Sequence, residues 1–388
     1  MLPTRTFIIP PVLITGSGSS EKVGEESKKL GVKKALIVTD EVLSKLGILE
    51  GVKKALSEIK IEFAIYDKIS TEPTVDYVRE GLKAYKENGC DFLVALGGGS
   101  ALDTAKAISI MITNPGSIEE YKGLGKVTKE GVPLIAIPTT GGTGSEVTQF
   151  TIITDTKTSV KMLIGSPFIM PRVAIVDPLL TLSCPRSLSA AVGIDALTHA
   201  IEAYVSLKSQ PMSDIFCLSA IELISGNLRQ AWANGNNVEA REKTMLGALQ
   251  AGIAFSNASV ALVHGMSRPI GAYFHVPHGA SNAALLGVVT EFSLIGNPVR
   301  YAHIAKAMGE NISGLTDLEA AQLAAKSIKT LIKDIKIPSL KELGVEKEKL
   351  DQLAPKMAED AIASGSPGNN PRQATKEEIV ELYKIAYA

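Results

Sequence analysis

The first 185 residues alternate short apolar runs with segments of helical periodicity, and this rhythm constrains the fold more than any other feature of the sequence. The runs are rich in Val, Ile, Leu and Ala and do not alternate with polar residues, which is typical of parallel strands covered on both faces. We therefore predict an α/β domain with a parallel sheet. The predicted strands are residues 35–40, 63–67, 92–98, 134–140 and 173–178, and the predicted helices include residues 41–59 and 75–88.

The pattern changes near Pro185, after which long helical segments follow without another convincing strand. These segments are residues 187–207, 214–232, 239–256, 318–335 and 376–387. We expect an α/β domain over residues 1–185 and an all-helical domain over residues 186–388.

Composition excludes several classes of protein. The net charge of −1 gives no basic excess for nucleic acid. The three cysteines are far apart and form no CxxC pair, which suits a reducing cytoplasm. The sequence has no run of about 18 or more apolar residues, so we expect no membrane-spanning helix. The N-terminal segment does not have the pattern of a signal peptide. We expect a cytoplasmic protein that binds neither nucleic acid nor membrane.

Three glycines, Gly97, Gly98 and Gly99, join a predicted strand to a predicted helix in DFLVALGGGSALDTAKAISIM. Glycines let the backbone approach a ligand where a Cβ would clash, and Ser100 and the first helical amides can face an anion. The pattern favours a phosphate-binding turn, although it is not GxGxxG. The alternative is a tight turn in which Ser100 caps the helix.

The next strand ends in PTTGGTGSEVT, which offers several hydroxyl groups among three further glycines. Because ligands bind at the carboxyl ends of strands in open α/β sheets, both loops together predict a phosphate-bearing cofactor. Asp40 ends an earlier strand. It either binds an adenosine ribose diol, which favours NAD over NADP, or caps the helix that starts at Glu41. The local sequence leaves both interpretations open.

A second set of residues is typical of a metal site. Asp195 and His199 are four apart in a helical pattern, so their side chains are adjacent on one face. Three of the five histidines, His264, His275 and His278, lie in VHGMSRPIGAYFHVPHG. A carboxylate with three imidazoles suits Fe(II), Zn(II), Co(II) or Mn(II). An isolated DxxxH is more often a polar pair, and spacing alone lets His275 replace a member of the set.

The motifs GGGSALDTAK, PTTGGTGSEVT, DALTHAIEAY and HGM…VPHG, in this order and spacing, resemble the iron-containing, or group III, alcohol dehydrogenases over essentially the whole chain. The resemblance implies a Rossmann-like N-terminal domain and an all-α C-terminal domain (the dehydroquinate synthase-like architecture), in a homodimer or higher homo-oligomer with the nicotinamide cofactor between the domains. It implies an NAD(P)-dependent alcohol dehydrogenase that transfers a hydride between NAD, less readily NADP, and a small primary alcohol, diol or aldehyde. Fe(2+), or Zn(2+) or another divalent metal, would polarise the substrate oxygen.

The resemblance also implies roles for single residues. The metal ligands would be Asp195, His199, His264 and His278. The cofactor would contact Asp40, Gly97, Gly98, Gly99, Ser100, Asp103, Thr139, Thr140, Ser145, Thr148 and Lys161, the last of which would reach the nicotinamide ribose.

Two departures from the family pattern matter. Glu72-Pro73-Thr74 stands where many members have Asn-Pro-Thr, so we expect an altered adenosine-side contact. Arg268 stands where many members have the second histidine of HxxxH. Arg268 either binds a substrate carboxylate, as in a hydroxy-acid or semialdehyde dehydrogenase, or pairs with a local acid or cofactor phosphate. His275 either takes over the proton relay of the missing histidine or is a packed or rim residue.

Overall fold

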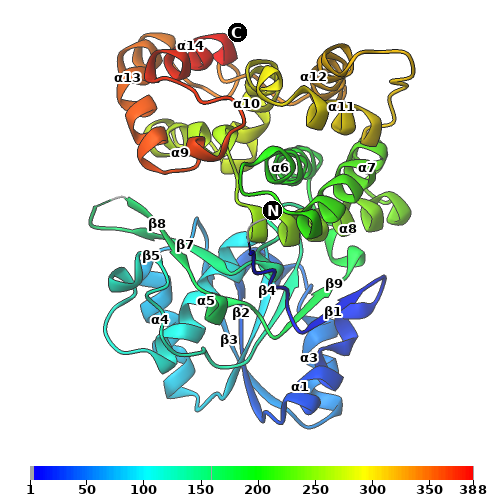
Figure 1. The fold of residues 1–388 in the computed structure, drawn as a ribbon. Helices are drawn as coiled ribbons and strands as arrows, with labels where there is room; N and C mark the ends of the chain where they lie inside the picture. The colour runs from blue at the N-terminus through cyan, green and yellow to red at the C-terminus, as the bar shows by residue number, and fades with distance from the viewer. Residues whose placement is uncertain (1–3, 159, 388) are drawn as a thin grey trace. The chain divides into compact units, whose positions relative to one another are not determined.

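The computed structural model describes residues 4–158 and 160–387, which divide into two compact units. One unit is Ile8–Ser183, and the other comprises the chain from Cys184 onward together with residues 4–7. The first unit is built of strands and helices and the second of helices (Figure 1). The change of unit therefore falls beside Pro185, where the sequence pattern changes.

A parallel sheet of six strands forms the centre of the α/β unit (Figure 1). Its order is β1-β9-β6-β4-β2-β3, and each neighbouring pair is parallel. The predicted parallel sheet is confirmed. All five predicted strands form, and β1 is a sixth strand that was not predicted. The six strands of the sheet are β1 (Val12–Thr15), β2 (Lys34–Asp40), β3 (Glu62–Ile69), β4 (Phe92–Gly97), β6 (Leu134–Pro138) and β9 (Val173–Val176).

Helices cover both faces of this sheet, which explains why its strands do not alternate apolar and polar residues. In β4, Leu93 and Ala95 belong to the core under α4 (Val75–Glu87) and α5 (Gly99–Thr113). The alternate residues Phe92 and Val94 belong to the core under α1 (Val23–Leu30) and α3 (Glu50–Glu58). Side chains on a strand point to opposite faces in turn, so every position of β4 is buried.

The prediction of a single helix over residues 41–59 is wrong. The chain forms α2 (Glu41–Lys45) and then α3, with a break in which Gly47 has φ +72°. Glycine adopts this left-handed backbone without a Cβ clash, which lets the chain turn. Short 3-10 helices complete the unit: η1 (Ser19–Lys22), η2 (Ile118–Tyr121), η3 (Ser145–Val147), η4 (Pro167–Ile169) and η5 (Pro178–Thr181).

A small second sheet of the α/β unit was not predicted. Its strands are β5 (Gly123–Leu124), β7 (Phe150–Asp155) and β8 (Val160–Gly165), and β7 and β8 form an antiparallel hairpin. The hairpin binds the segment before α4, because Thr154 N donates to Pro73 O at 2.8 Å.

The helical unit packs its helices around one continuous apolar core. All five segments predicted to be helical are helices in the structure. The unit contains α6 (Arg186–Val205), α7 (Pro211–Ala233), α8 (Val238–Ala258), α9 (Leu262–Phe274), α10 (His278–Ser293), η6 (Leu294–Gly296), α11 (Pro298–Ala307), α12 (Asp317–Asp334), α13 (Lys347–Ala363), η7 (Pro367–Asn369) and α14 (Lys376–Tyr387).

The N-terminal residues 4–7 are fastened to the helical unit by hydrogen bonds at the start of α7. Arg5 donates from Nη1 to the carbonyl groups of Lys208 and Ser209, and Gln210 Nε2 donates to Thr6 O at 3.2 Å.

The stretch His278–Gly296 is long and apolar enough to cross a membrane by length and composition, and 61% of it is buried inside the structure. Helices α8 and α9 meet the same criterion only together, across a bend of 101°. Both stretches supply residues to the apolar core of the helical unit, which accounts for their composition.

The corner between α8 and α9 is held by side chains from other parts of the unit. Ser259 has φ +66° at the bend, and Asn369 Nδ2 donates to Ser259 Oγ and Val260 O at 3.1 and 2.9 Å. Helix α9 continues through Pro269 to Phe274, so it does not end before the proline.

Candidate metal centre and cofactor site

Helix α6 presents Asp195 and His199 inside the helical unit, with 2% and 5% of their surfaces exposed. Their spacing of four residues places them one above the other on the helix. His264, from the first turn of α9, is 3% exposed and completes a group whose three ligand atoms lie within 4.8 Å of one another. The structure thus brings together three of the four expected ligands in one buried cluster.

His278 is the first residue of α10 and approaches the same cluster. Its Nε2 lies 3.9 Å from Asp195 Oδ1, and that of His264 lies 3.7 Å from the same oxygen. The side chain of His278 is 36% exposed, whereas that of His264 is 4% exposed. The cluster therefore has its exposed side at His278.

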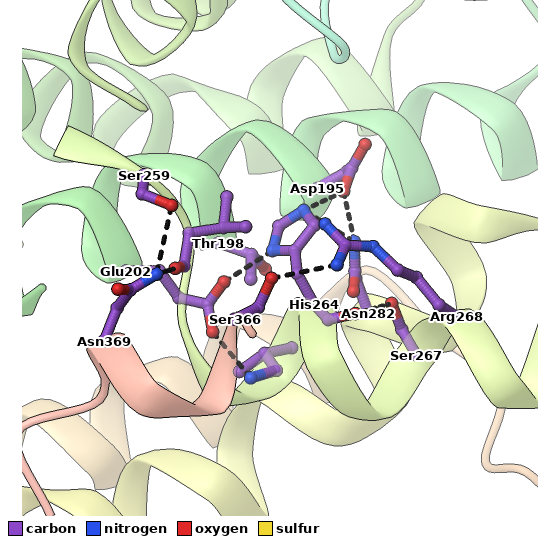
Figure 2. Close-up of polar contacts among 12 residues, drawn as sticks. Asp195, Thr198, Glu202, Ser259, His264, Ser267, Arg268, Asn282, Ser366 and Asn369 are labelled. Carbon is purple, nitrogen blue, oxygen red and sulfur yellow. Dashed lines mark hydrogen bonds and ion pairs between the residues drawn. The ribbon is translucent and has the colours of Figure 1, made fainter. Parts of the chain in front are cut away.

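Asn282, one turn after His278 on α10, marks the point where the ligand atoms converge. Figure 2 shows its side chain beside Asp195 and His264. Its Nδ2 lies 2.6 Å from Asp195 Oδ1, 3.1 Å from His264 Nε2 and 3.2 Å from His278 Nε2. An amide NH₂ group has two hydrogens, so it can donate to only two of these three acceptors. A cation at the point of convergence would satisfy all three.

Glu202 orients His264 and was missed in the sequence. Its Oε2 accepts from His264 Nδ1 and its Oε1 from Val263 N, both at 2.5 Å (Figure 2). A carboxylate on Nδ1 fixes the tautomer and leaves the Nε2 lone pair directed at the cluster, as second partners of metal-bound histidines do. Glu202 follows Asp195 by seven residues, so helical periodicity alone places both on one face of α6.

The electrostatics of the cluster match those of a metal site. Burial lowers the pKa of His199 to about 3 and that of His264 well below its ordinary value, so both imidazoles are neutral. Burial alone would raise the pKa of Asp195, but its electrostatic interactions with the neighbouring imidazole rings and the hydrogen bond from Asn282 outweigh burial, and the net pKa is lowered. Neutral imidazoles and an ionised carboxylate are the protonation states that a metal requires.

One buried polar atom of the cluster also fits a bound cation. His199 Nδ1 has no hydrogen-bond partner among the described residues, which is costly for a buried group. One carboxylate and three imidazoles suit Fe(II), Zn(II), Co(II) or Mn(II). The residues present therefore fit a divalent cation of this class.

Arg268 and His275, the two further candidates on this segment, occupy different environments. Arg268 is half-buried on α9, where its Nη1 donates to Ser366 Oγ at 2.8 Å. Burial lowers its pKa, while the nearby charge of Glu202 raises it. His275 is the exposed last cap of α9, with φ +56°. Within the described residues, the structure gives the His275 side chain no hydrogen bond or ion pair.

In the α/β unit, the cofactor candidates lie where the strand order reverses. From β2 the chain continues outward to β3 and then returns to β4 on the other side of β2. Such switch points are where open α/β sheets bind ligands. Asp40 ends β2, and its Oδ2 would lie 3.8 Å from a Cβ on Gly97, the last residue of β4. Asp40 Oδ1 accepts from Leu43 N at 2.8 Å, which confirms the predicted N-cap without excluding a ribose contact.

The two glycine-rich loops lie side by side at this edge. A Cβ on Gly99 would lie 2.8 Å from Thr143 Cγ2, and one on Gly98 would lie 3.7 Å from Thr140 Oγ1. Gly98 is the N-cap of α5, so the alternative in which Ser100 caps this helix is wrong. Helix α5 begins directly after Gly98, so the backbone amides of its first residues can face an anion bound at this loop.

Several expected cofactor residues also hold the second loop in place. The Asp103 carboxylate accepts from Ser145 Oγ and from Ile152 N, the latter at 2.8 Å. Thr148 Oγ1 accepts from Lys106 Nζ at 2.8 Å. Lys106, which the sequence reasoning missed, is fully buried, and burial lowers its pKa to about 8.

Thr139 and Lys161 are two further residues expected to contact the cofactor. Thr139 is buried at the end of β6, and its amide donates to Gly97 O at 3.0 Å. Lys161 lies on β8, and its Nζ forms an ion pair with Glu72 Oε2 at 2.6 Å. The family departure at Glu72 therefore contacts an expected cofactor residue directly.

Comparison with known proteins agrees with this geometry. Residues 10–178 match the model of the iron-containing alcohol dehydrogenases, and residues 189–387 match that of the C-terminal domain of the Fe-containing alcohol dehydrogenase family. The NAD-dependent methanol dehydrogenase of Bacillus methanolicus is 42% identical, over 98% of this chain and 99% of that protein.

Solved structures give the same result. A crystal structure of 1,3-propanediol oxidoreductase superposes with a TM-score of 0.96 at 42% identity, covering 99% of this chain and 100% of the other. A sulfoacetaldehyde reductase from Bifidobacterium kashiwanohense, solved with NAD+, superposes with a TM-score of 0.89 at 28% identity over 100% of both chains. The chain therefore belongs to the iron-containing alcohol dehydrogenase family.

Proposed function

We propose that this protein is a metal-dependent, NAD-linked dehydrogenase that interconverts small primary alcohols or diols with aldehydes. The observation that carries the proposal is the buried convergence of Asp195, His199, His264 and His278 in a unit that belongs to this family. The methanol and 1,3-propanediol enzymes named among the relatives support the substrate class.

Asp195, His199, His264 and His278 would hold the metal, which when bound supplies a Lewis acid that lowers the pKa of a substrate hydroxyl. Iron is proposed from the family, and the donor set accepts zinc equally well. Glu202 holds His264 in the tautomer that a metal needs. The exposed edge at His278 is the side from which we expect the substrate to enter.

The α/β unit, which we assign to residues 1–185, would bind NAD at its switch point. The Gly97–Gly99 turn and the start of α5 can hold the diphosphate. Asp40 at the end of β2 would accept from the ribose hydroxyls and repel a 2′-phosphate, which supports NAD over NADP. Residues 186–388 would bind metal and substrate.

Oligomeric state, cellular location and proton transfer are part of the proposal. We propose a cytoplasmic homodimer or higher homo-oligomer, on the family resemblance and on three cysteines that are free in the structure. His275 remains a candidate for proton transfer because its exposed imidazole precedes His278 by three residues on the same segment.

Oxidation of a substrate panel tests the proposal. Purified protein would be mixed with NAD and primary alcohols, diols or hydroxy acids, and the absorbance of the reduced cofactor recorded before chelation, after chelation, and after return of Fe(II) or Zn(II). We expect activity that chelator removes and metal restores. Asp195→Ala should lose metal content and activity together. If protein that is shown to bind both metal and NAD oxidises no substrate of the panel, the proposal is overturned.

A further inference from the structure

Arg268 brings a permanent positive charge to the candidate metal centre. It follows His264 by one turn on α9. Figure 2 shows its side chain extending toward His264 and Asn282. Two positive charges, the guanidinium and a bound cation, would therefore stand close together in a poorly solvated region.

The guanidinium has unused hydrogen-bonding capacity. Arginine offers five N–H donors, and one of them donates to Ser366 Oγ. Among the residues that the structure describes, Arg268 has no other hydrogen-bond partner and no carboxylate within ion-pair distance. Half-buried arginines normally pair with an anion, because burial without a partner is costly.

Glu202 and Asp195 do not fill this role, because each carboxylate is engaged with groups other than Arg268. Glu202 gives one oxygen to Val263 N and the other to His264 Nδ1. Asp195 Oδ1 accepts from Asn282 and faces the imidazoles of the cluster. Neither carboxylate reaches the fork of the guanidinium.

Close packing fixes the position of Arg268. A Cβ on Gly265 would lie 2.6 Å from Pro367 Cγ, so α9 lies directly against the segment that carries Ser366. Ser366 is 6% exposed, and its amide donates to Ser364 Oγ at 3.3 Å. The arginine and its serine partner are thus pre-positioned and pay little ordering cost on binding a ligand.

We propose that Arg268 and Ser366 form an anion subsite beside the metal centre, and that it binds the carboxylate of a short hydroxy acid or of the corresponding semialdehyde. The inference rests on the proposed function and narrows its substrate class. A guanidinium matches a carboxylate bidentately, through two parallel N–H···O bonds. The carboxylate would also separate the two positive charges, which a neutral alcohol cannot do.

A matched pair of substrates tests the subsite. 4-Hydroxybutanoate and 4-hydroxybutanamide have nearly the same shape and differ in charge. We expect the wild-type enzyme to favour the acid at least tenfold in kcat/KM. Arg268→Gln should lower this acid-to-amide ratio at least tenfold, Arg268→Lys should lower it less, and Ser366→Ala should lower it a few-fold. Arg229→Gln, which removes an exposed ion pair with Asp334 in the same unit, should leave the ratio unchanged.

Binding without turnover gives a second readout. Calorimetric titration of butanoate into the metal-loaded protein should give a Kd at least tenfold weaker in Arg268→Gln than in wild type. A melting curve of each variant separates loss of the subsite from loss of the fold, and Ser366→Ala provides the test if Arg268→Gln is unstable.

The outcomes distinguish the two proposals. A wild-type acid-to-amide ratio near one, or equal losses on both substrates in Arg268→Gln, would overturn the subsite while the dehydrogenase function stands. If the metal-loaded protein oxidises neither the acid, the amide nor simple alcohols, the proposed function fails as well.

Discussion

Replacing Glu202 by glutamine should weaken metal binding although none of the four proposed ligands is changed. Glu202 accepts from Val263 N and His264 Nδ1, both at 2.5 Å, and is 3% exposed. Glutamine has one carbonyl oxygen, so it can serve only one of these donors. If the oxygen faces Val263, the amide NH₂ meets His264 Nδ1. The ring proton must then move to Nε2, the atom that faces Asp195, and that tautomer cannot bind a cation.

The expected loss can be bounded. Changing the carboxylate partner of a metal-bound histidine typically costs 10–100-fold in metal affinity, or about 1.4–2.8 kcal/mol. If the glutamine turned the other way, its NH₂ would meet the Val263 amide. That would leave a buried N–H unpaired at the start of α9, at about 1–3 kcal/mol of stability. Each orientation therefore has a measurable cost.

Competition with a chromophoric chelator for Zn(II) or Co(II) measures the affinity, and denaturant unfolding measures the stability. Glu310→Gln is the matched control, because Glu310 is a half-buried glutamate in the same unit whose partner is Ser327. Metal affinity within twofold of wild type, at unchanged stability, would refute the orienting role of Glu202.

Three further predictions concern the rest of the molecule. In Gly279→Ala the new Cβ would lie 2.9 Å from Ala191 O, so α10 must move away from α6. The free energy of unfolding should fall by about 1–3 kcal/mol, and metal affinity should fall with it. The control Gly226→Ala, whose new Cβ has nothing within 4 Å, should not destabilise the protein. Burial raises the pKa of Glu146 to about 7, so the folded state keeps a proton that the unfolded chain loses above about pH 4.5, and stability falls as pH rises through this window. The free energy of unfolding of Glu146→Gln, relative to that of wild type, should therefore rise by about 1–3 kcal/mol between pH 5 and pH 8. If the two proteins differ in stability by the same amount at both pH values, the assignment is wrong. Asp40→Ser keeps an N-cap residue for Leu43 but removes the carboxylate, so kcat/KM for NADP should rise at least tenfold relative to NAD; an unchanged ratio would leave Asp40 only its capping role.

The fold was predictable where burial is complete on both faces. The runs that became β2, β4 and β6 are continuously apolar because helices cover them on both sides. Strand β1 lies at the sheet edge with every second residue exposed, and its four residues give too short a pattern to recognise. The hairpin of β7 and β8 was missed for a related reason, because buried residues are mixed with half-buried ones along β7 and with exposed ones along β8.

The site was predictable where spacing along one helix is sufficient. Asp195 and His199 followed from a separation of four residues, and Glu202 was open to the same argument. Ser366 was not, because it meets Arg268 across 98 residues of sequence, through contact of Gly265 with Pro367. Such a contact depends on how two distant segments pack, which no local pattern encodes.

The attachment of residues 4–7 to the helical unit has a consequence for how the protein is made. The residues of the Ile8–Ser183 unit are contiguous, so all of them have been synthesised before Asp195 is added. Arg5, in contrast, bonds to carbonyl groups of Lys208 and Ser209. At about 5–20 residues per second, translation separates these partners by about 10–40 s. Residues 4–7 are therefore made long before the segment to which they dock, and a bulky protein fused ahead of them should delay completion of the helical unit while sparing the α/β unit.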